Sequence, residues 1–266
     1  MEHEKYLKAI EVNPSIIKMI QNPTDEMKYL ALKKEGLVLE YIQNPTREME
    51  ALAVTSNPRA IRFVEEPTEE MMMIAIHKGW NILEYIKKPT QKVLEAAISQ
   101  SGWAIQYVQN PTIALQLQAV SNNYDAIKYI KEPDESVQIL AVQKNYEALR
   151  YITSPTEQVE LLAIKENEAA VHFIKEMNED KRLAFLKTNI LVIKYMSHEM
   201  TKEELETAIR EVIAEEHVEE KYIRDMLNCH TLDKYAHEQG FDRLLLIHQY
   251  GSKKARQIAV DEMLKR

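Results

Sequence analysis

The sequence predicts an all-α fold: an α-solenoid of stacked two-helix repeats, each of 22 residues, closed by a diverged helical C-terminal cap. Three observations support this prediction. Apolar residues recur at helical spacing within each repeat. Glycine is scarce, with 5 in 266 residues. Seven prolines stand 22 residues apart without a slip, and a similar stretch follows each one: Pro23, Pro45, Pro67, Pro89, Pro111, Pro133 and Pro155.

The first helix of each repeat begins just after the proline, which is counted as repeat position 0. Position 1 is usually threonine, such as Thr68, and acidic residues such as Glu69 and Glu70 often follow it. A threonine hydroxyl accepts from the free amides of a helix start, and carboxylates complement the positive end of the helix dipole. Since proline ends the preceding helix, we expect a helix of about ten residues after each threonine.

The second helix of each repeat follows a short turn. Position 8 of the first helix is alanine in eight copies, from Ala9 to Ala163, which allows neighbouring helices to approach closely. Position 12 is usually asparagine or glycine, as in Asn57 and Gly79, residues that tolerate the left-handed backbone closing a helix. Apolar residues then recur over about seven residues, which predicts a helix with partial 3₁₀ character. Position 18 of this helix is aromatic in eight copies.

The repeat pattern places two regions along the chain. Residues 1–198 hold nine tandem repeats, since counting back from Pro23 reaches Met1 and a ninth copy without proline covers 177–198. Residues 199–266 are interpreted as diverged repeats that form the C-terminal cap. Helices are expected there from Thr201 to Val212, over 218–228, 232–239 and 241–250, and after Ser252.

Composition restricts the class of protein. The net charge of −8 argues against a dedicated nucleic-acid binder, because such proteins carry a positive surplus. The single cysteine, Cys229, excludes an intrachain disulfide and fits a reducing compartment. The charged start does not resemble a signal peptide, and no apolar run is long enough to span a bilayer. We therefore expect a protein of the bacterial or host-cell cytoplasm that has no membrane partner.

The repeats resemble a known group of sequences. The run Leu-Ala-Val-Gln-Lys-Asn-Tyr-Glu-Ala-Leu-Arg-Tyr at 140–151 and its copies are similar to the AV-x-x-N-x-x-AL-x-Y repeats of a domain-of-unknown-function family in bacterial and phage proteins. This chain departs from that pattern in its strict Pro-Thr punctuation and in its C-terminal region. The resemblance implies an α-solenoid without an assigned chemistry. It also favours a phage protein that binds or inhibits a host or defence protein.

An aromatic row is the first candidate for partner binding. It lies at positions 13 and 14, between the two helices of a repeat, and includes both tryptophans of the chain. Its members are Trp80, Trp103, Tyr124 and Tyr146. Aromatic side chains at the edge of a repeat are good anchors for a protein partner. The alternative interpretation is a structural rim, in which each ring packs onto the neighbouring turn.

A basic stripe is the second candidate. Positions 17 and 20 lie on the second helix, and they turn basic in the later repeats, with Lys128, Lys131, Arg150, His172, Lys175 and Lys194. Such a stripe fits an acidic peptide, an acidic partner or a nucleic-acid backbone. The alternative is a solvated face with cations favoured at helix C-termini.

The predicted function is that of a protein-interaction scaffold that binds or masks a macromolecular partner. The alternative is nucleic-acid-backbone binding along the basic stripe. No phosphate-binding glycine loop or nucleophile elbow occurs in the sequence. Cys229, His230, His237 and His248 lack the spacing of a metal site. We therefore predict that the chain is not an enzyme and has no catalytic residues, metal or cofactor.

Overall fold

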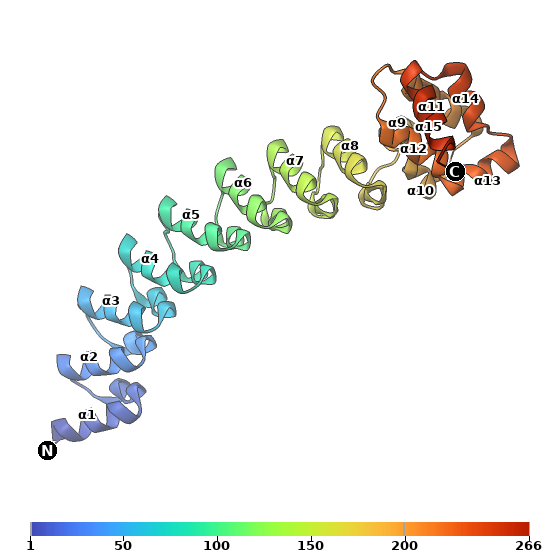
Figure 1. Cartoon of the computed structure of the whole chain (residues 1–266). Helices are drawn as coiled ribbons and strands as arrows, with labels where there is room; N and C mark the ends of the chain where they lie inside the picture. Colours follow the sequence, from blue (N-terminus) through green and yellow to red (C-terminus); the bar gives the residue numbers. More distant parts are fainter. Residues whose placement is uncertain (1, 199, 266) are drawn as a thin grey trace. The chain divides into compact units, whose positions relative to one another are not determined.

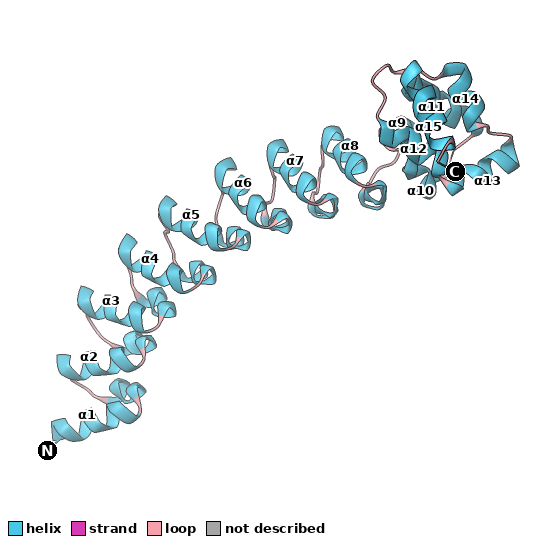
Figure 2. Cartoon of the chain, viewed as in Figure 1, coloured by secondary structure: helices cyan, strands magenta, loops and turns pink. Residues whose placement is uncertain are grey.

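The computed structural model describes residues 2–198 and 200–265, apart from the side chains of 234–236, 238 and 239, and all regular elements in this part are helices (Figures 1 and 2). The predicted all-α solenoid is confirmed. The second to eighth repeats each pair a ten-residue α-helix with a six-residue 3₁₀ helix. By compactness the chain divides into two units, residues 1–131 and 132–266.

Unit 1 contains six repeats. Each α-helix packs against the α-helix of the next repeat, and each 3₁₀ helix packs against the next 3₁₀ helix. The second helix is 3₁₀ throughout, where the sequence predicted partial 3₁₀ character. The elements are α1 (Glu2–Val12), η1 (Pro14–Met19), α2 (Asp25–Lys34), η2 (Gly36–Tyr41), α3 (Arg47–Ser56), η3 (Pro58–Phe63), α4 (Glu69–Lys78), η4 (Trp80–Tyr85), α5 (Gln91–Gln100), η5 (Gly102–Tyr107), α6 (Ile113–Asn122) and η6 (Tyr124–Tyr129).

Unit 2 contains three repeats and the C-terminal helices. In the ninth repeat the second helix starts as 3₁₀ and ends as α. The elements are α7 (Glu135–Lys144), η7 (Tyr146–Tyr151), α8 (Glu157–Glu166), η8 (Glu168–Phe173), α9 (Glu179–Thr188), η9 (Ile190–Val192), α10 (Ile193–Met196), α11 (Lys202–Ala214), α12 (Glu220–Asn228), α13 (His230–Gln239), α14 (Arg243–Tyr250) and α15 (Lys253–Met263). The helices after 198 lie close to their expected ranges. The predicted boundary at 198 marks the end of the repeat pattern, whereas the two compact units meet at residues 131 and 132. The division of the chain into repeats and a C-terminal cap at 198 stays a prediction.

The residues shared by the repeats build the scaffold. Thr46 caps α3, and its Oγ1 accepts from the amide of Met49 at 3.2 Å, as the sequence predicted. The alanines at position 8 from Ala31 to Ala163 are fully buried. The carbonyl of Ala53 lies close to Gly36 of the preceding repeat, where a Cβ would stand only 2.1 Å from the oxygen. Position 8 is therefore a point of close backbone approach.

The asparagines at position 12 correct one expectation. Asn57 is extended, with φ −141° and ψ 110°, and Gly79 is extended as well, with φ 168°. The predicted left-handed backbone is therefore wrong at both positions. The reason is that the chain passes directly from the α-helix into the 3₁₀ helix. Asn57 caps the start of η3, where its Oδ1 accepts from the amide of Arg59 at 3.1 Å.

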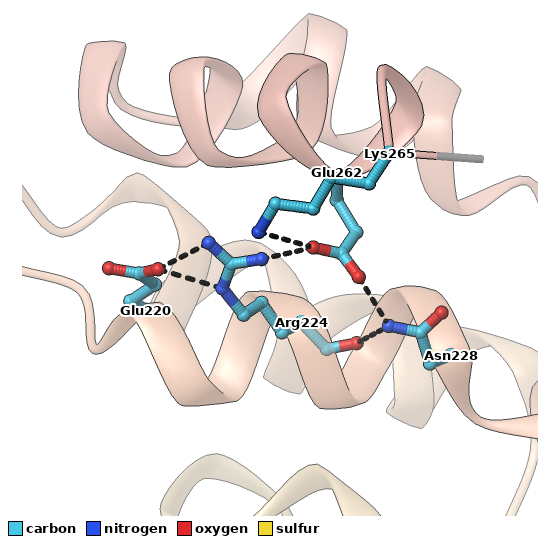
Figure 3. A network of polar contacts seen from close by, with 5 residues as sticks. All are labelled: Glu220, Arg224, Asn228, Glu262 and Lys265. Atoms are coloured by element: carbon cyan, nitrogen blue, oxygen red, sulfur yellow. Dashed lines mark hydrogen bonds and ion pairs between the residues drawn. The ribbon is translucent and has the colours of Figure 1, made fainter.

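A polar network ties α12 to α15 in unit 2 (Figure 3). The guanidinium of Arg224 binds the carboxylates of Glu220 and Glu262, with Nε of Arg224 2.7 Å from Oε1 of Glu220. The Nδ2 of Asn228 donates to Oε1 of Glu262 at 3.0 Å. The Nζ of Lys265 lies 3.7 Å from the same carboxylate. Glu262 therefore links α15, the last helix, to α12.

Replacing Glu262 by glutamine is expected to destabilise unit 2 near neutral pH, but not in acid. The hydrogen bond from Asn228 lowers the pKa of Glu262 below its ordinary value of 4.5, desolvation opposes this, and the charge of Arg224 reinforces it. A carboxyl with a depressed folded-state pKa stabilises the fold above its unfolded-state pKa. That contribution is lost as the pH falls through the folded-state pKa. Thermal unfolding of wild type and Glu262→Gln, from neutral pH to well below 4.5, measures this. Identical melting at neutral pH would contradict the role given to this carboxylate.

Candidate functional site

The exposed side chains of the 3₁₀ helices form a regular surface in each unit. Positions 17 and 18 of every repeat contribute to it, and we call the resulting set the ring strip. In unit 1 several of its members are strongly exposed, with Met19 at 77%, Tyr41 at 43% and Tyr129 at 41%. The ring strip of unit 1 comprises Lys18, Met19, Glu40, Tyr41, Arg62, Phe63, Glu84, Tyr85, Gln106, Tyr107, Lys128 and Tyr129.

Side chains of adjacent repeats contact one another along the ring strip of unit 1. The Nζ of Lys18 lies 5.7 Å from the centroid of the Tyr41 ring, and the guanidinium carbon of Arg62 lies 5.7 Å from that of Tyr85. Each cation therefore sits over the ring of the next repeat. Burial raises the pKa of Tyr107, and the negative charge of Glu84 reinforces the effect.

A hollow lies between neighbouring 3₁₀ helices at two places in unit 1. Between η4 and η5 it has a volume of about 490 Å³, and its lining includes Leu83, Ile86, Pro89, Leu94 and Tyr107. Between η1 and η2 an equivalent hollow of about 470 Å³ is lined at matching repeat positions by Ile17, Ile20, Pro23, Lys28 and Tyr41. Each hollow therefore has apolar residues and a proline in its wall and the ring-strip tyrosine of the next repeat at one side.

The aromatic row lies beside the ring strip, and its two tryptophans contact the following repeat. The Trp80 ring is half-buried, and its centroid lies 6.3 Å from that of Tyr107. Trp103 is 40% exposed, and its Nε1 donates to Oδ1 of Asp125 at 2.8 Å. Tyr124 is half-buried. Trp80 thus supports a tyrosine that lines a hollow, and of these three rings Trp103 is the most accessible.

The fourth ring of the row, Tyr146, belongs to unit 2. It is half-buried, and its centroid lies 6.3 Å from that of Phe173. This contact has the same repeat positions as the one between Trp80 and Tyr107 in unit 1. Packing on the neighbouring repeat, as the rim interpretation expects, leaves the outer edge of such a ring available to a partner. Both interpretations of the row therefore remain open.

The basic stripe is divided between the two units. In unit 1, Lys128 forms an ion pair with Asp125 at 2.9 Å, and the hydrogen bond to that carboxylate raises the pKa of Lys128. The same ammonium lies 5.8 Å from the ring of Trp103. Lys131 is exposed. Lys128 is therefore partly neutralised by its own repeat.

In unit 2 the basic residues are ordered by neighbouring groups. The guanidinium of Arg150 lies 4.8 Å from the ring centroid of Phe173, and the His172 ring meets Tyr195 edge-on at 4.6 Å. The Nζ of Lys175 donates to the carbonyl of Thr153 at 2.8 Å. The side chains of Arg150, His172 and Lys175 are all exposed, on or directly after the 3₁₀ helices η7 and η8.

The hollows are the part of the site that the sequence pattern did not reveal. Their walls come from positions 16 and 19, which the pattern marks only as apolar, and their volume depends on the distance between 3₁₀ helices. The one sequence signal for a hollow is the recurrent aromatic at position 18, which comes shortly before the proline of the next repeat. It indicates a ring near a turn but does not show an open space next to it.

The described residues include no group of three or more His, Cys, Asp or Glu side chains placed to hold a metal ion. Cys229 is buried, whereas His230 is exposed and lies 3.2 Å from Asp233. None of the described helices has the length and apolar character needed to cross a membrane. Comparisons with protein families, with curated proteins and with solved structures found no match to this chain.

Proposed function

We propose that the chain is a protein-interaction scaffold that binds or masks a macromolecular partner through the ring strip of its 3₁₀ helices. The observation that carries this proposal is the recurrent hollow beside an exposed or half-buried tyrosine. The threonine, alanine and asparagine shared by the repeats serve caps and close packing. Within the ring strip, position 18 is aromatic in eight repeats and supplies a recurrent ring, whereas position 17 differs between repeats and can therefore encode a partner.

The ring strip has the properties of an interface anchor. Tyr41 is 43% exposed, yet the Lys18 ammonium of the preceding repeat holds one face of its ring. Aromatic side chains already fixed in this way lose little conformational freedom on binding. The adjoining hollow can accept a side chain of the partner. The proposed partner in a bacterial or host cytoplasm, a host or defence protein bound by a phage-encoded inhibitor, rests on the family resemblance alone.

Nucleic-acid-backbone binding is the second candidate, favoured by the basic residues of unit 2. The net charge of −8 opposes it, and two cations have carboxylate partners. Arg150 lies 3.9 Å from Glu147, and Lys194 lies 2.8 Å from Glu168. Such pairs reduce the charge left for phosphates. Binding that weakens steeply with added salt would favour this second candidate.

Replacing Tyr41 and Tyr129 together by serine should abolish partner capture while the fold is kept. Both rings are more than 40% exposed, so few internal contacts are lost. Losing two aromatic anchors should weaken binding at least about tenfold. The measurement is affinity purification with tagged wild type and variant, with mass spectrometry of the proteins retained.

A matched control is Ile113→Ser, which removes an apolar side chain that is 49% exposed and lies on α6, outside the ring strip. This control should retain the proteins that wild type retains. If the double tyrosine variant is folded by circular dichroism and captures the same proteins as wild type, the ring strip of unit 1 is not the binding surface.

A further inference from the structure

The ring strip of unit 2, taken together with position 20 beside it, differs in charge from the same positions of unit 1. The ring strip of unit 2 comprises Arg150, Tyr151, His172, Phe173, Lys194 and Tyr195. At positions 17 and 20, unit 1 mixes acids such as Glu40 and Glu84 with bases such as Arg62 and Lys87. The three repeats of unit 2 carry only basic or neutral side chains at the same positions. These are Arg150, Thr153, His172, Lys175, Lys194 and Ser197.

Each basic side chain in this part of unit 2 is held in place by the fold. Phe173 supports the guanidinium of Arg150, and Tyr195 supports the ring of His172. Lys175 donates to the carbonyls of Ile152 and Thr153 at 3.3 and 2.8 Å. A ligand that pairs with such ordered groups does not have to immobilise them, so binding loses less entropy.

Of the two carboxylates that lie near these cations, only Glu168 forms a hydrogen bond with one of them. Glu168 accepts from Nζ of Lys194 at 2.8 Å, whereas Glu147 is 3.9 Å from Arg150, which is too long for a hydrogen bond. Arg150 is therefore stacked on a ring while its N–H groups are not committed to Glu147. A planar guanidinium in this state matches a carboxylate, which it can bind through two parallel hydrogen bonds. The surface thus has a positive excess and an anchor for an acidic group.

The spacing of the repeats indicates the form of the ligand. The 3₁₀ helices η7, η8 and η9 pack against one another in order. Helix packing distances place equivalent side chains roughly 8–10 Å apart. A polyproline II segment has three residues per turn and rises about 3.1 Å per residue, so every third side chain lies on one side about 9 Å from the last. In a β-strand, side chains three residues apart point to opposite faces.

We propose that the ring strip of unit 2 binds an extended acidic segment of a partner protein that presents a carboxylate at every third residue. Arg150, His172 and Lys194 each face one repeat of this segment, and Lys175 lies between the second and third. The inference rests on the proposed function, because it names the chemistry of the partner. It concerns unit 2 alone, so it can fail while the capture experiment on the unit 1 tyrosines still succeeds.

The test is fluorescence anisotropy with the full chain and labelled peptides of equal composition. A repeated Glu-Pro-Ala peptide carries a glutamate at every third residue, and its comparison peptide has the same glutamates in one block. The spaced peptide should bind at least about tenfold more tightly than the blocked one. A repeated Lys-Pro-Ala peptide should not bind, because the strip repels its charge.

Variants assign the binding to this surface. Arg150→Met should weaken binding of the spaced peptide about tenfold or more. Arg150→Lys should weaken it less, because lysine keeps the positive charge but lacks the planar guanidinium that donates two parallel hydrogen bonds. The matched control is Arg62→Met in unit 1. The guanidinium carbon of Arg62 lies 4.8 Å from the ring centroid of Phe63 and 5.7 Å from that of Tyr85, and Arg150 stacks in the same way on Tyr151 and Phe173. Arg62, however, belongs to the ring strip of unit 1, in which acidic and basic residues are mixed. This control should bind like wild type.

Four results would overturn the inference. The first two are an absence of binding by the spaced peptide and equal binding of both glutamate peptides. Another is unchanged affinity in Arg150→Met and Arg150→Lys when circular dichroism shows both variants folded. The last is tighter binding of oligothymidylate than of the spaced peptide, which would assign the surface to a nucleic-acid backbone.

Discussion

Ala75→Leu is expected to destabilise the repeat stack by roughly 1–3 kcal/mol. Ala75 is fully buried at position 8 of α4, and the same position is a buried alanine in the neighbouring repeats. At the equivalent place in α3, the backbone of the preceding repeat comes so close that a Cβ on Gly36 would stand 2.1 Å from the carbonyl of Ala53. A larger side chain in this row must push α4 away from its neighbours.

Chemical denaturation followed by circular dichroism measures this effect. The matched control is Ala114→Leu on α6, because Ala114 is exposed and a larger side chain there meets solvent. The control should change stability by less than about 0.5 kcal/mol. If both variants unfold with the midpoint of wild type, position 8 does not set the distance between repeats.

Gly102→Ala is expected to have the second largest effect on stability, a loss of roughly 1–3 kcal/mol. A Cβ at Gly102 would lie 2.1 Å from the carbonyl oxygen of Ala119 in α6, and this oxygen belongs to the backbone and cannot rotate away. The amide of Gly102 also donates to Oδ1 of Asn123 at 2.8 Å. Pro58 and Trp80 occupy the same repeat position with a Cβ, so we infer that glycine lets η5 approach the next repeat more closely than η3 and η4 do.

Gly79→Ala provides the control for Gly102→Ala. A Cβ at Gly79 would meet only Oδ1 of Asn81 at 2.9 Å, which is the end of a flexible side chain. The φ of 168° is extended and open to any residue. This change should be neutral or stabilise by up to about 1 kcal/mol, because it reduces the freedom of the unfolded chain. Equal melting temperatures for the two alanine variants would show that the close approach at Gly102 does not matter.

Much of the fold was predictable because its signals are local and repeated. The threonine that caps most α-helices of the repeats, the proline that ends the previous element and the alanine at position 8 act within a few residues of where they stand. Thr46 and Ala53 illustrate this, one as a cap and the other fully buried. Because the same signals repeat along the chain, most predicted helix boundaries lie within a few residues of those in the structure.

The remaining features depend on distances between repeats. Asn57 departs from its predicted backbone conformation because asparagine favours both a left-handed helix end and the cap of a following helix. Only the direct passage of the chain into η3 decides between the two. The contact of Trp80 with Tyr107 joins residues of two repeats, so the sequence pattern alone left both the rim and the anchor interpretation open. The hollow between η4 and η5 likewise follows from how closely two helices pack.

The central claim is that a partner protein covers the ring strip, and tyrosine labelling of the captured complex tests it most directly. Tyr41 and Tyr129 are 43% and 41% exposed on the ring strip of unit 1, and Tyr250 on α14 is 45% exposed outside it. Iodination read by mass spectrometry should therefore modify all three in the free chain. In the complex, the account predicts protection of Tyr41 and Tyr129 and full labelling of Tyr250. Unchanged labelling of both strip tyrosines in a complex that protects Tyr250 would contradict it.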